Sequence, residues 1–340
     1  MWLSVFRSLF IVIVLVPGII ACGAGLKAAG TAERVETTIV ETGTAISTPH
    51  LSATPEPVLS PTNSPASLTM PVKTLTKTAT RNSTRIATKT PTSALVLTTT
   101  PTLPACLKQP GQIAKSSLPT SLLRYPLEYR VYLPPCYTEQ ADRRYPVLYL
   151  FHGQGYTDDQ WDRIGVDEKS DHLIAAGIIA PLIIVMPHDV SSAQPAETNF
   201  SKVIVRRLVP AIDQTYRTKP ERLYRAVGGM SRGGGWAIHF GINFWQIFGA
   251  LGAHSPAVFH SDGLQMNTLL DALPPGESPR IYIDIGERDR PEILEVANWF
   301  EGLLDQRDIP HEWHLFAGYH AESYWSAHLE QYLIWYTQGW

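Results

Sequence analysis

A serine and an arginine lie among five glycines in the segment Gly228–Gly235, which has the sequence GGMSRGGG and follows the apolar run LYRAV. A phosphate-binding P-loop needs a lysine that this segment lacks, and the glycine register of a dinucleotide-binding loop does not match either. Residues 229–233 match the pattern Gly-x-Ser-x-Gly, in which a tight turn between a strand and a helix exposes a serine hydroxyl. We therefore predict that Ser231 is a nucleophile on such a turn.

A nucleophilic serine needs a base to take its proton, and the base needs an acid to orient it. Asp289 follows the apolar run RIYIDIG, and His320 follows the apolar run EWHLFAG. If both runs are strands, both side chains come from loops at strand ends. The chain order serine, aspartate, histidine is the order that a hydrolytic triad takes on an α/β sheet.

Other side chains near the same runs compete for these two roles. Asp284 lies inside the predicted strand and Glu287 lies one residue beyond it, so we assign the acid role to Asp289. The remaining histidines of this region flank or enter the last strand or lie well inside the final helix, where we expect packing or exposed roles: His311, His314 and His328.

The run YLFHGQG ends an earlier predicted strand and supplies the fourth part of the site. Backbone N–H groups can stabilise the negative oxygen of a tetrahedral intermediate. We expect this oxyanion hole to consist of the backbone amides of Gln154 and Arg232, while His152 holds the loop by hydrogen bonds. The sequence offers no cluster of metal ligands and no cofactor motif beside these residues, so we expect the chemistry to need neither a metal nor a cofactor.

Apolar runs alternate with helix-like segments throughout this part of the chain. Strand–helix alternation of this kind predicts an α/β fold with a mainly parallel sheet covered on both faces, in which ligands bind at the carboxyl ends of the strands. The expected strands are 125–134, 146–151, 182–187, 224–229, 248–253, 280–286 and 312–318, and the expected helices lie near 167–177, 199–216, 233–243, 291–306 and 322–336.

The N-terminus has the layout of an export signal. One arginine, Arg7, precedes a short apolar core that ends in the sequence IIACG. The core is too short to span a membrane comfortably, and the cysteine after a small residue is similar to a bacterial lipobox. We predict a lipoprotein-type signal peptide over residues 1–22 with lipidation of Cys22, which anchors the exported chain to the outer face of the cell membrane. The alternative is an ordinary signal or anchor with an incidental cysteine.

Residues 23–105 are dominated by Thr, Pro, Ser and Ala and contain hardly an aromatic side chain. Such a segment cannot bury enough apolar surface to offset its chain entropy, so we predict a disordered linker. Basic residues recur every fourth position in KTLTKTATRNSTRIATKTPT. This repeat could contact anionic envelope polymers, or it could belong to a solvated and glycosylated spacer.

Residues 106–340 have ordinary globular composition and form the predicted catalytic domain. The whole chain has a net charge of −3, which gives no electrostatic case for binding nucleic acid. In an exported protein the pair Cys106 and Cys136 favours a disulfide over a metal site, with two free thiols as the alternative. We expect a monomer.

Several segments of this domain resemble the esterase branch of the α/β-hydrolases, which includes enterochelin esterase-like proteins, feruloyl and acetylxylan esterases, and S-formylglutathione hydrolases. The resemblance extends over nearly all of 106–340 and implies an α/β-hydrolase fold with a Ser231–His320–Asp289 triad. The segments that carry it are YRVYLPPCY, RRYPVLYLFHGQG, DHLIAAGIIAPLIIVMP, LVPAIDQTYRT, AVGGMSRGGGWAIHFG, IDIGERD and AGYHAESYW.

Arg232 departs from this family, whose members usually have SMGG at the turn. Its guanidinium could recognise an anionic group of the substrate, or it could point sideways into a structural ion pair. The sequence leaves both alternatives open.

The resemblance and the export signal together imply a surface-tethered serine esterase. We expect an ester substrate that carries acyl or feruloyl groups on carbohydrate. The alternatives are an acyltransferase that uses the same triad to acylate cell-envelope sugars, a siderophore (enterochelin-like) esterase, and a binding lipoprotein without catalytic activity.

Overall fold

A computed structural model describes residues 104–340. The predicted signal peptide with Cys22, and all of the predicted linker except its last two residues, lie outside the described residues. Within the described range, no helix has both the length and the apolar character required to cross a membrane.

The described chain builds one eight-stranded sheet with the strand order β1-β2-β4-β3-β5-β6-β7-β8. Strand β1 is antiparallel to β2, and β2 is antiparallel to β4. The six strands β3 to β8 are mutually parallel. The bounds are β1 Gln112–Leu118, β2 Leu127–Leu133, β3 Val147–Phe151, β4 Ile183–Pro187, β5 Arg225–Met230, β6 Ala250–His254, β7 Arg280–Gly286 and β8 Glu312–Phe316.

The central strands are buried on both faces because helices cover the sheet on either side. In β3 every residue is buried, and successive side chains enter different apolar clusters. Val147, Tyr149 and Phe151 face one cluster, whereas Leu148 and Leu150 face the other. This alternation follows from the two-residue period of a strand and gives the domain three layers.

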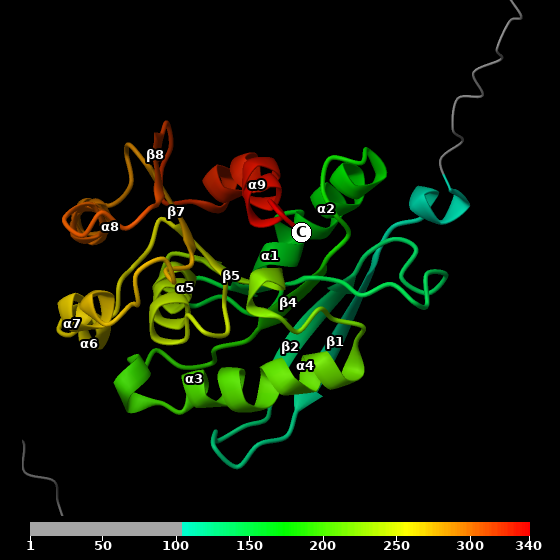
Figure 1. The fold of residues 1–340 in the computed structure, drawn as a ribbon, viewed down its shortest axis with the longest axis horizontal. Helices are drawn as coiled ribbons and strands as arrows, with labels where there is room; N and C mark the ends of the chain where they lie inside the picture. Colours follow the sequence, from blue (N-terminus) through cyan, green and yellow to red (C-terminus); the bar gives the residue numbers. More distant parts are fainter. Residues whose placement is uncertain (1–103) are drawn as a thin grey trace, which may run out of the picture. The chain divides into compact units, whose positions relative to one another are not determined.

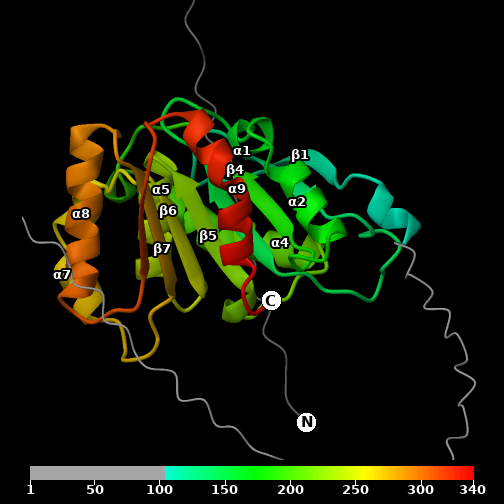
Figure 2. The same cartoon turned by 90° about the horizontal axis from the view of Figure 1, so that it is seen from above.

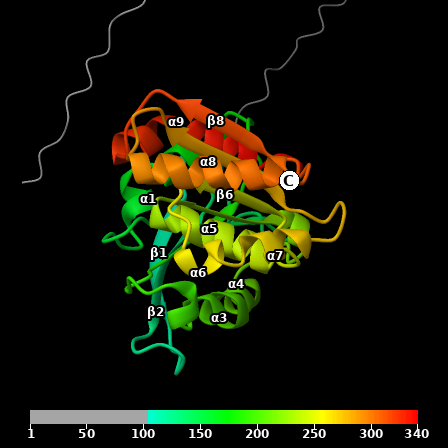
Figure 3. The ribbon, with the colours of Figure 1, turned by 90° about the vertical axis from the view of Figure 1, so that its left-hand side faces the viewer.

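The helices divide between the two faces. Helices α1, α2 and α9 pack on one face, where α2 contacts α9, and the helices from α3 to α8 lie on the other face and along its edge (Figures 1 and 2). The bounds are α1 Gln160–Arg163, α2 Val166–Ala175, α3 Phe200–Val203, α4 Val209–Thr215, α5 Arg232–Asn243, α6 His260–Gly263, α7 Met266–Asp271, α8 Pro291–Asp305 and α9 Glu322–Tyr336. A π-helical turn over Ile204–Leu208 joins α3 to α4. Helix α8 runs beside the β7–β8 end of the sheet (Figure 3).

The predicted α/β-hydrolase fold is confirmed, and the seven expected strands correspond to β2–β8. The prediction missed β1, whose sequence QIAKSSL is polar and largely exposed because this strand lies at the edge of the sheet. It also missed the short helices α1, α6 and α7, which are too brief to show a helical period.

The predicted disulfide between Cys106 and Cys136 is present and spans 30 residues. It links a short 3-10 turn, Ala105–Lys108, to the segment that follows β2. The bond thus ties the start of the domain to the end of its second strand.

Candidate active site

The sharp turn at Ser231 joins the end of β5 to the start of α5. Ser231 has φ 54° and ψ −121°, a strained conformation for a residue with a side chain. A Cβ atom on Gly229 would lie 2.1 Å from the carbonyl oxygen of Gly233, and one on Gly233 would lie 2.1 Å from that of Phe151. Both glycines are therefore needed for the backbone to pack this closely, as the Gly-x-Ser-x-Gly pattern predicts.

Three side chains from different loops meet at this turn. His320 Nε2 lies 2.9 Å from Ser231 Oγ, and His320 Nδ1 lies 2.8 Å from Asp289 Oδ1. A carboxylate accepts from Nδ1–H, so Nε2 is the nitrogen that can accept the serine proton. The order of the sheet brings them together, since β5, β7 and β8 present their carboxyl ends at the same edge.

The carboxyl group of Asp289 is held as a carboxylate. Burial alone would raise its pKa, but the hydrogen bond from His320, together with the other donors around the carboxylate, outweighs burial, so the pKa of Asp289 lies below its ordinary value. The backbone N–H of Arg290 also donates to Asp289 Oδ1 over 2.7 Å. An ionised acid at this position orients His320 and stabilises its protonated form.

The competing acids lie elsewhere. Asp284 is fully buried in β7 and accepts hydrogen bonds from His254, Tyr324 and Tyr332 beneath the site. Glu287 is exposed. The other candidate histidines make contacts away from the Ser231 turn and take no part in the hydrogen-bonded set: His311, His314 and His328.

The two predicted oxyanion-hole amides flank the serine. Within residues 104–340 the backbone N–H groups of Gln154 and Arg232 donate to no protein acceptor, so both are available to a ligand. The loop of Gln154 is fixed, because Gln160 Oε1 accepts the neighbouring Gly153 N–H over 2.7 Å. His152 Nε2 accepts the Asp189 N–H over 2.9 Å beneath this loop, which is the structural role that its position predicted.

The side chain of Arg232 turns away from the serine. Its guanidinium donates to Asp189 Oδ2 over 2.8 Å and to the Ala193 carbonyl over 2.7 Å, and both members of the ion pair are buried. Of the two alternatives for Arg232, the structure therefore has the structural ion pair. The pair anchors the loop 188–194, whose Ser192 hydroxyl accepts from the Gln154 side chain over 2.6 Å.

A groove of about 430 Å³ opens between the loops 122–127 and 188–200. Leu122, Tyr125 and Val190 are exposed apolar side chains on its walls. A larger hollow of about 900 Å³ lies at the amino end of β7 and β8. Neither hollow is lined by Ser231, Asp289 or His320, but the first adjoins the loop 188–194, which Arg232 anchors beside the serine turn.

Five aromatic residues lie near the site segments in the sequence. Trp161, Trp236 and Trp325 are buried in the core, and Trp245 lies just beyond the end of α5 that is remote from Ser231. Tyr319 remains, with its ring exposed next to His320. The three buried indole rings fill space between the helices and the sheet. Local sequence does not show whether a tryptophan takes such a packing position or an exposed one.

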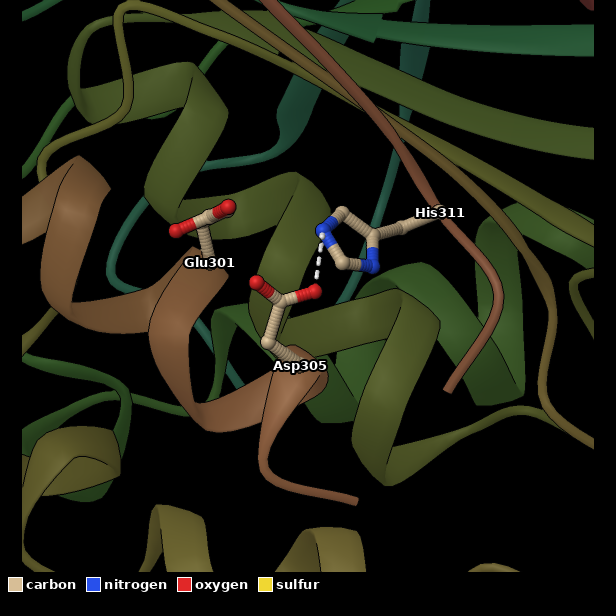
Figure 4. A group of neighbouring side chains, drawn as sticks. All are labelled: Glu301, Asp305 and His311. Atoms are coloured by element: carbon tan, nitrogen blue, oxygen red, sulfur yellow. Dashed lines mark ion pairs between the residues drawn. The ribbon is translucent and has the colours of Figure 1, made fainter. Parts of the chain in front are cut away.

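Among the described residues, one group of three could hold a metal ion: Glu301, Asp305 and His311 (Figure 4). His311 Nε2 lies 3.8 Å from Asp305 Oδ1, and the Asp305 side chain is 69% exposed. The group lies at the end of α8 and before the amino end of β8, whereas Ser231 follows the carboxyl end of β5, which is parallel to β8. It takes no part in the site.

Comparison with known proteins identifies the family. A family model described as "Putative esterase" matches residues 121–336, which is well over half of the chain and includes the whole site. The chain belongs to this esterase family. The family is one of serine hydrolases, so the esterase match agrees with the geometry around Ser231.

Individual relatives of this esterase domain include feruloyl esterases. The chain is 30% identical over 178 residues to an endo-1,4-beta-xylanase/feruloyl esterase of Xylanibacter ruminicola, a match that covers 49% of this chain and 23% of that protein. It is 33% identical over 154 residues to esterase Rv1288 of Mycobacterium tuberculosis, covering 42% of this chain and 32% of that protein. The chain thus matches no more than about a third of the length of these relatives.

Solved structures share the fold. A ferulic acid esterase has a TM-score of 0.61 at 24% identity, covering 68% of this chain and 99% of that one. The ferulic acid esterase of Anaeromyces mucronatus in complex with ferulic acid has a TM-score of 0.56 at 21% identity, covering 66% and 90%. These similarities confirm the α/β-hydrolase fold of the esterase domain.

Proposed function

We propose that this chain is a serine carboxylic ester hydrolase that works through a Ser231–His320–Asp289 triad. The observation that carries the proposal is the continuous hydrogen-bonded set from Ser231 Oγ through the His320 ring to Asp289, on a turn strained to expose the serine. Membership of the esterase family supports the same reaction class.

In this mechanism Ser231 Oγ attacks the ester carbonyl while His320 Nε2 takes its proton. The amides of Gln154 and Arg232 stabilise the oxyanion of the tetrahedral intermediate, and each such donor typically contributes on the order of 3 kcal/mol. The protonated His320 then gives its proton to the leaving alcohol. Water, deprotonated by His320, hydrolyses the acyl-enzyme and restores the free serine.

We propose an acyl or feruloyl ester of a carbohydrate as the substrate. Two similarities support this class: a relative named as a xylanase/feruloyl esterase, and a structural neighbour solved with ferulic acid. The open groove beside the loop 188–200, with Tyr125 on its wall, suits a planar or aromatic group better than a buried lipid chain.

The test is hydrolysis of p-nitrophenyl acetate and methyl ferulate by the full chain and by its Ser231→Ala variant. We expect the variant to lose activity by about 10³-fold or more, since its nucleophile is gone. A wild-type rate equal to that of the variant would contradict the esterase proposal.

Product analysis with added acceptor sugars separates hydrolysis from acyl transfer, because only transfer yields an acylated sugar.

We also propose that the chain is exported and held at the outer face of the membrane through lipid on Cys22. The support is the sequence of residues 1–22. The test is to express the chain in a bacterium that is fed radiolabelled palmitate. The wild type should then carry label in the membrane fraction, and Cys22→Ser should carry none. Equal labelling of the two proteins would overturn lipidation at this cysteine.

A further inference from the structure

Ser255 immediately follows β6, the strand that lies between the nucleophile strand β5 and the acid strand β7. The backbone around it is bonded to both neighbours. Ser231 N–H donates to the His254 carbonyl over 2.9 Å, and Ser255 N–H donates to the Asp284 carbonyl over 2.7 Å. Ser255 therefore lies between the nucleophile turn and the strand that leads to Asp289.

The side chain of Ser255 is fully buried, and the mechanism above does not use it. Its Oγ has no hydrogen-bond partner of good geometry among the described residues, and neither has the buried Oδ2 atom of Asp289. The other carboxylate oxygen, Oδ1, is occupied by His320 and by the Arg290 amide. Both side chains lie at the carboxyl edge of neighbouring strands, since Ser255 N–H bonds to the Asp284 carbonyl of β7 and Asp289 follows the end of β7. A buried donor and a buried acceptor without other partners thus lie at the same edge of the sheet, and the lowered pKa of Asp289 agrees with a donor there.

The backbone gives an independent reason to assign a role to this side chain. Ser255 has φ 45°, a left-handed conformation that glycine adopts without strain and serine does not. Among the described residues only four non-glycine residues have positive φ, and Ser231 is another of them. Strain of this kind persists where the surrounding structure or the function requires the side chain. A turn alone would be served better by glycine.

We propose that Ser255 is a positioning residue whose hydroxyl donates to Asp289 Oδ2 and thereby holds Oδ1 toward His320. The inference deepens the proposed esterase mechanism and rests on it. In this arrangement both oxygens of Asp289 are fixed, one by Ser255 and one by His320. The carboxylate then cannot rotate away when His320 becomes protonated during the reaction.

Two variants of the full chain, Ser255→Gly and Ser255→Ala, distinguish the role of the hydroxyl group from the role of the residue in the turn. Both variants lack the donor, but glycine relieves the strain and alanine keeps it. If the hydroxyl positions Asp289, both should lose about tenfold or more in kcat on p-nitrophenyl acetate with KM little changed, because a hydrogen bond to a charged group is worth a factor of that order. If Ser255 is only a turn residue, Ser255→Gly should keep wild-type kcat and gain stability, and that result overturns the proposal.

A second readout does not depend on activity. The proton of the His320 Nδ1–Asp289 hydrogen bond should give a far-downfield proton NMR signal. We expect Ser255→Gly to shift or broaden this signal and Ser170→Ala, a fully buried serine in α2 that bonds to the Val166 carbonyl, to leave it in place. An unchanged signal in Ser255→Gly contradicts the proposal even if the chain proves not to be an esterase. Inactivity of the wild type, by contrast, contradicts only the esterase function.

Discussion

At the scale of single residues, the buried ion pair between Arg232 and Asp189 joins the Ser231 turn to the loop 188–194. Arg232 follows Ser231, so its backbone amide lies beside the proposed nucleophile while its side chain holds the loop 188–194. Through Ser192, that loop contacts the side chain of Gln154, whose amide is the second proposed oxyanion donor. One residue thus links both amides of the oxyanion hole to a common loop.

Asp189→Asn should therefore lower both stability and kcat. Removing one partner of a buried pair leaves the other charge uncompensated, which costs about 3–5 kcal/mol in the free energy of unfolding. Urea denaturation and ester hydrolysis measure the two effects. Glu330→Gln, which breaks the half-exposed pair with Lys169, is the control and should cost less than about 1 kcal/mol. Equal stabilities of the two variants would show that the buried pair does not anchor the loop.

At the scale of elements, two glycines let the last helix dock on the sheet. Gly228 in β5 and Gly252 in β6 are register partners, and a Cβ on either would lie within about 2 Å of the Tyr336 hydroxyl oxygen. Tyr336 belongs to α9, and its hydroxyl reaches His254 Nε2 over 2.9 Å. Because His320 lies just before α9, this contact helps to set the position of His320, the proposed base.

Gly252→Ala should destabilise the domain by about 1–3 kcal/mol, because the added methyl group overpacks against Tyr336. Tyr336→Phe in the same chain removes the hydroxyl that clashes first, so the double variant should be less destabilised than the sum of the single variants. Thermal unfolding of all three proteins gives the coupling energy. Gly302→Ala in α8 is the control: its added Cβ meets no atom within 4 Å, so it should be neutral or stabilising. Simple additivity would contradict this packing account.

At the scale of the whole molecule, the three layers are tied together at their margins. The Cys106–Cys136 disulfide closes a loop over the antiparallel edge, and such a loop contributes about 3–4 kcal/mol by restricting the unfolded chain. At the other margin, α8 packs Phe300 and Leu303 against the sheet. The site therefore lies on rigid parallel strands between two secured edges.

The first turn of α2 makes the stability of the molecule depend on pH. Burial and the neighbouring Glu168 carboxyl group raise the pKa of Asp167 to about 7 in the folded chain, compared with about 3.9 when unfolded. The folded state then keeps a proton that the unfolded state loses, so this group lowers stability as pH rises from about 4 to 7.

Asp167→Asn removes this titration and should raise the melting temperature at pH 8 by more than at pH 4. Asp167 is partly exposed, so we expect a gain of only a few degrees. Calorimetry at both pH values measures it, with the exposed Asp142→Asn as the control. A gain that is the same at pH 4 and pH 8 would rule out Asp167 as the source of the pH dependence.

Local sequence determined the parts of this protein that depend on neighbouring residues. The alternation of short apolar runs with amphipathic segments predicted β2–β8 and the five longer helical segments, and the glycine pattern predicted the Ser231 turn. In a parallel sheet the strand ends meet at one edge, so chain order sufficed to predict Asp289 and His320 as the companions of Ser231. The export signal and the absence of further metal ligands near Cys106 and Cys136 predicted the disulfide.

Only the tertiary structure decided what depends on contacts between distant segments. Arg232 meets Asp189 from 43 residues earlier in the chain, and Tyr336 enters the notch between β5 and β6 from the last helix. The position of Ser255 between Ser231 and Asp289 depends on the order of strands in the sheet. Periodicity and turn preference report the conformation of a few neighbouring residues, whereas these contacts arise when the layers pack, and a single sequence carries no local signal for them.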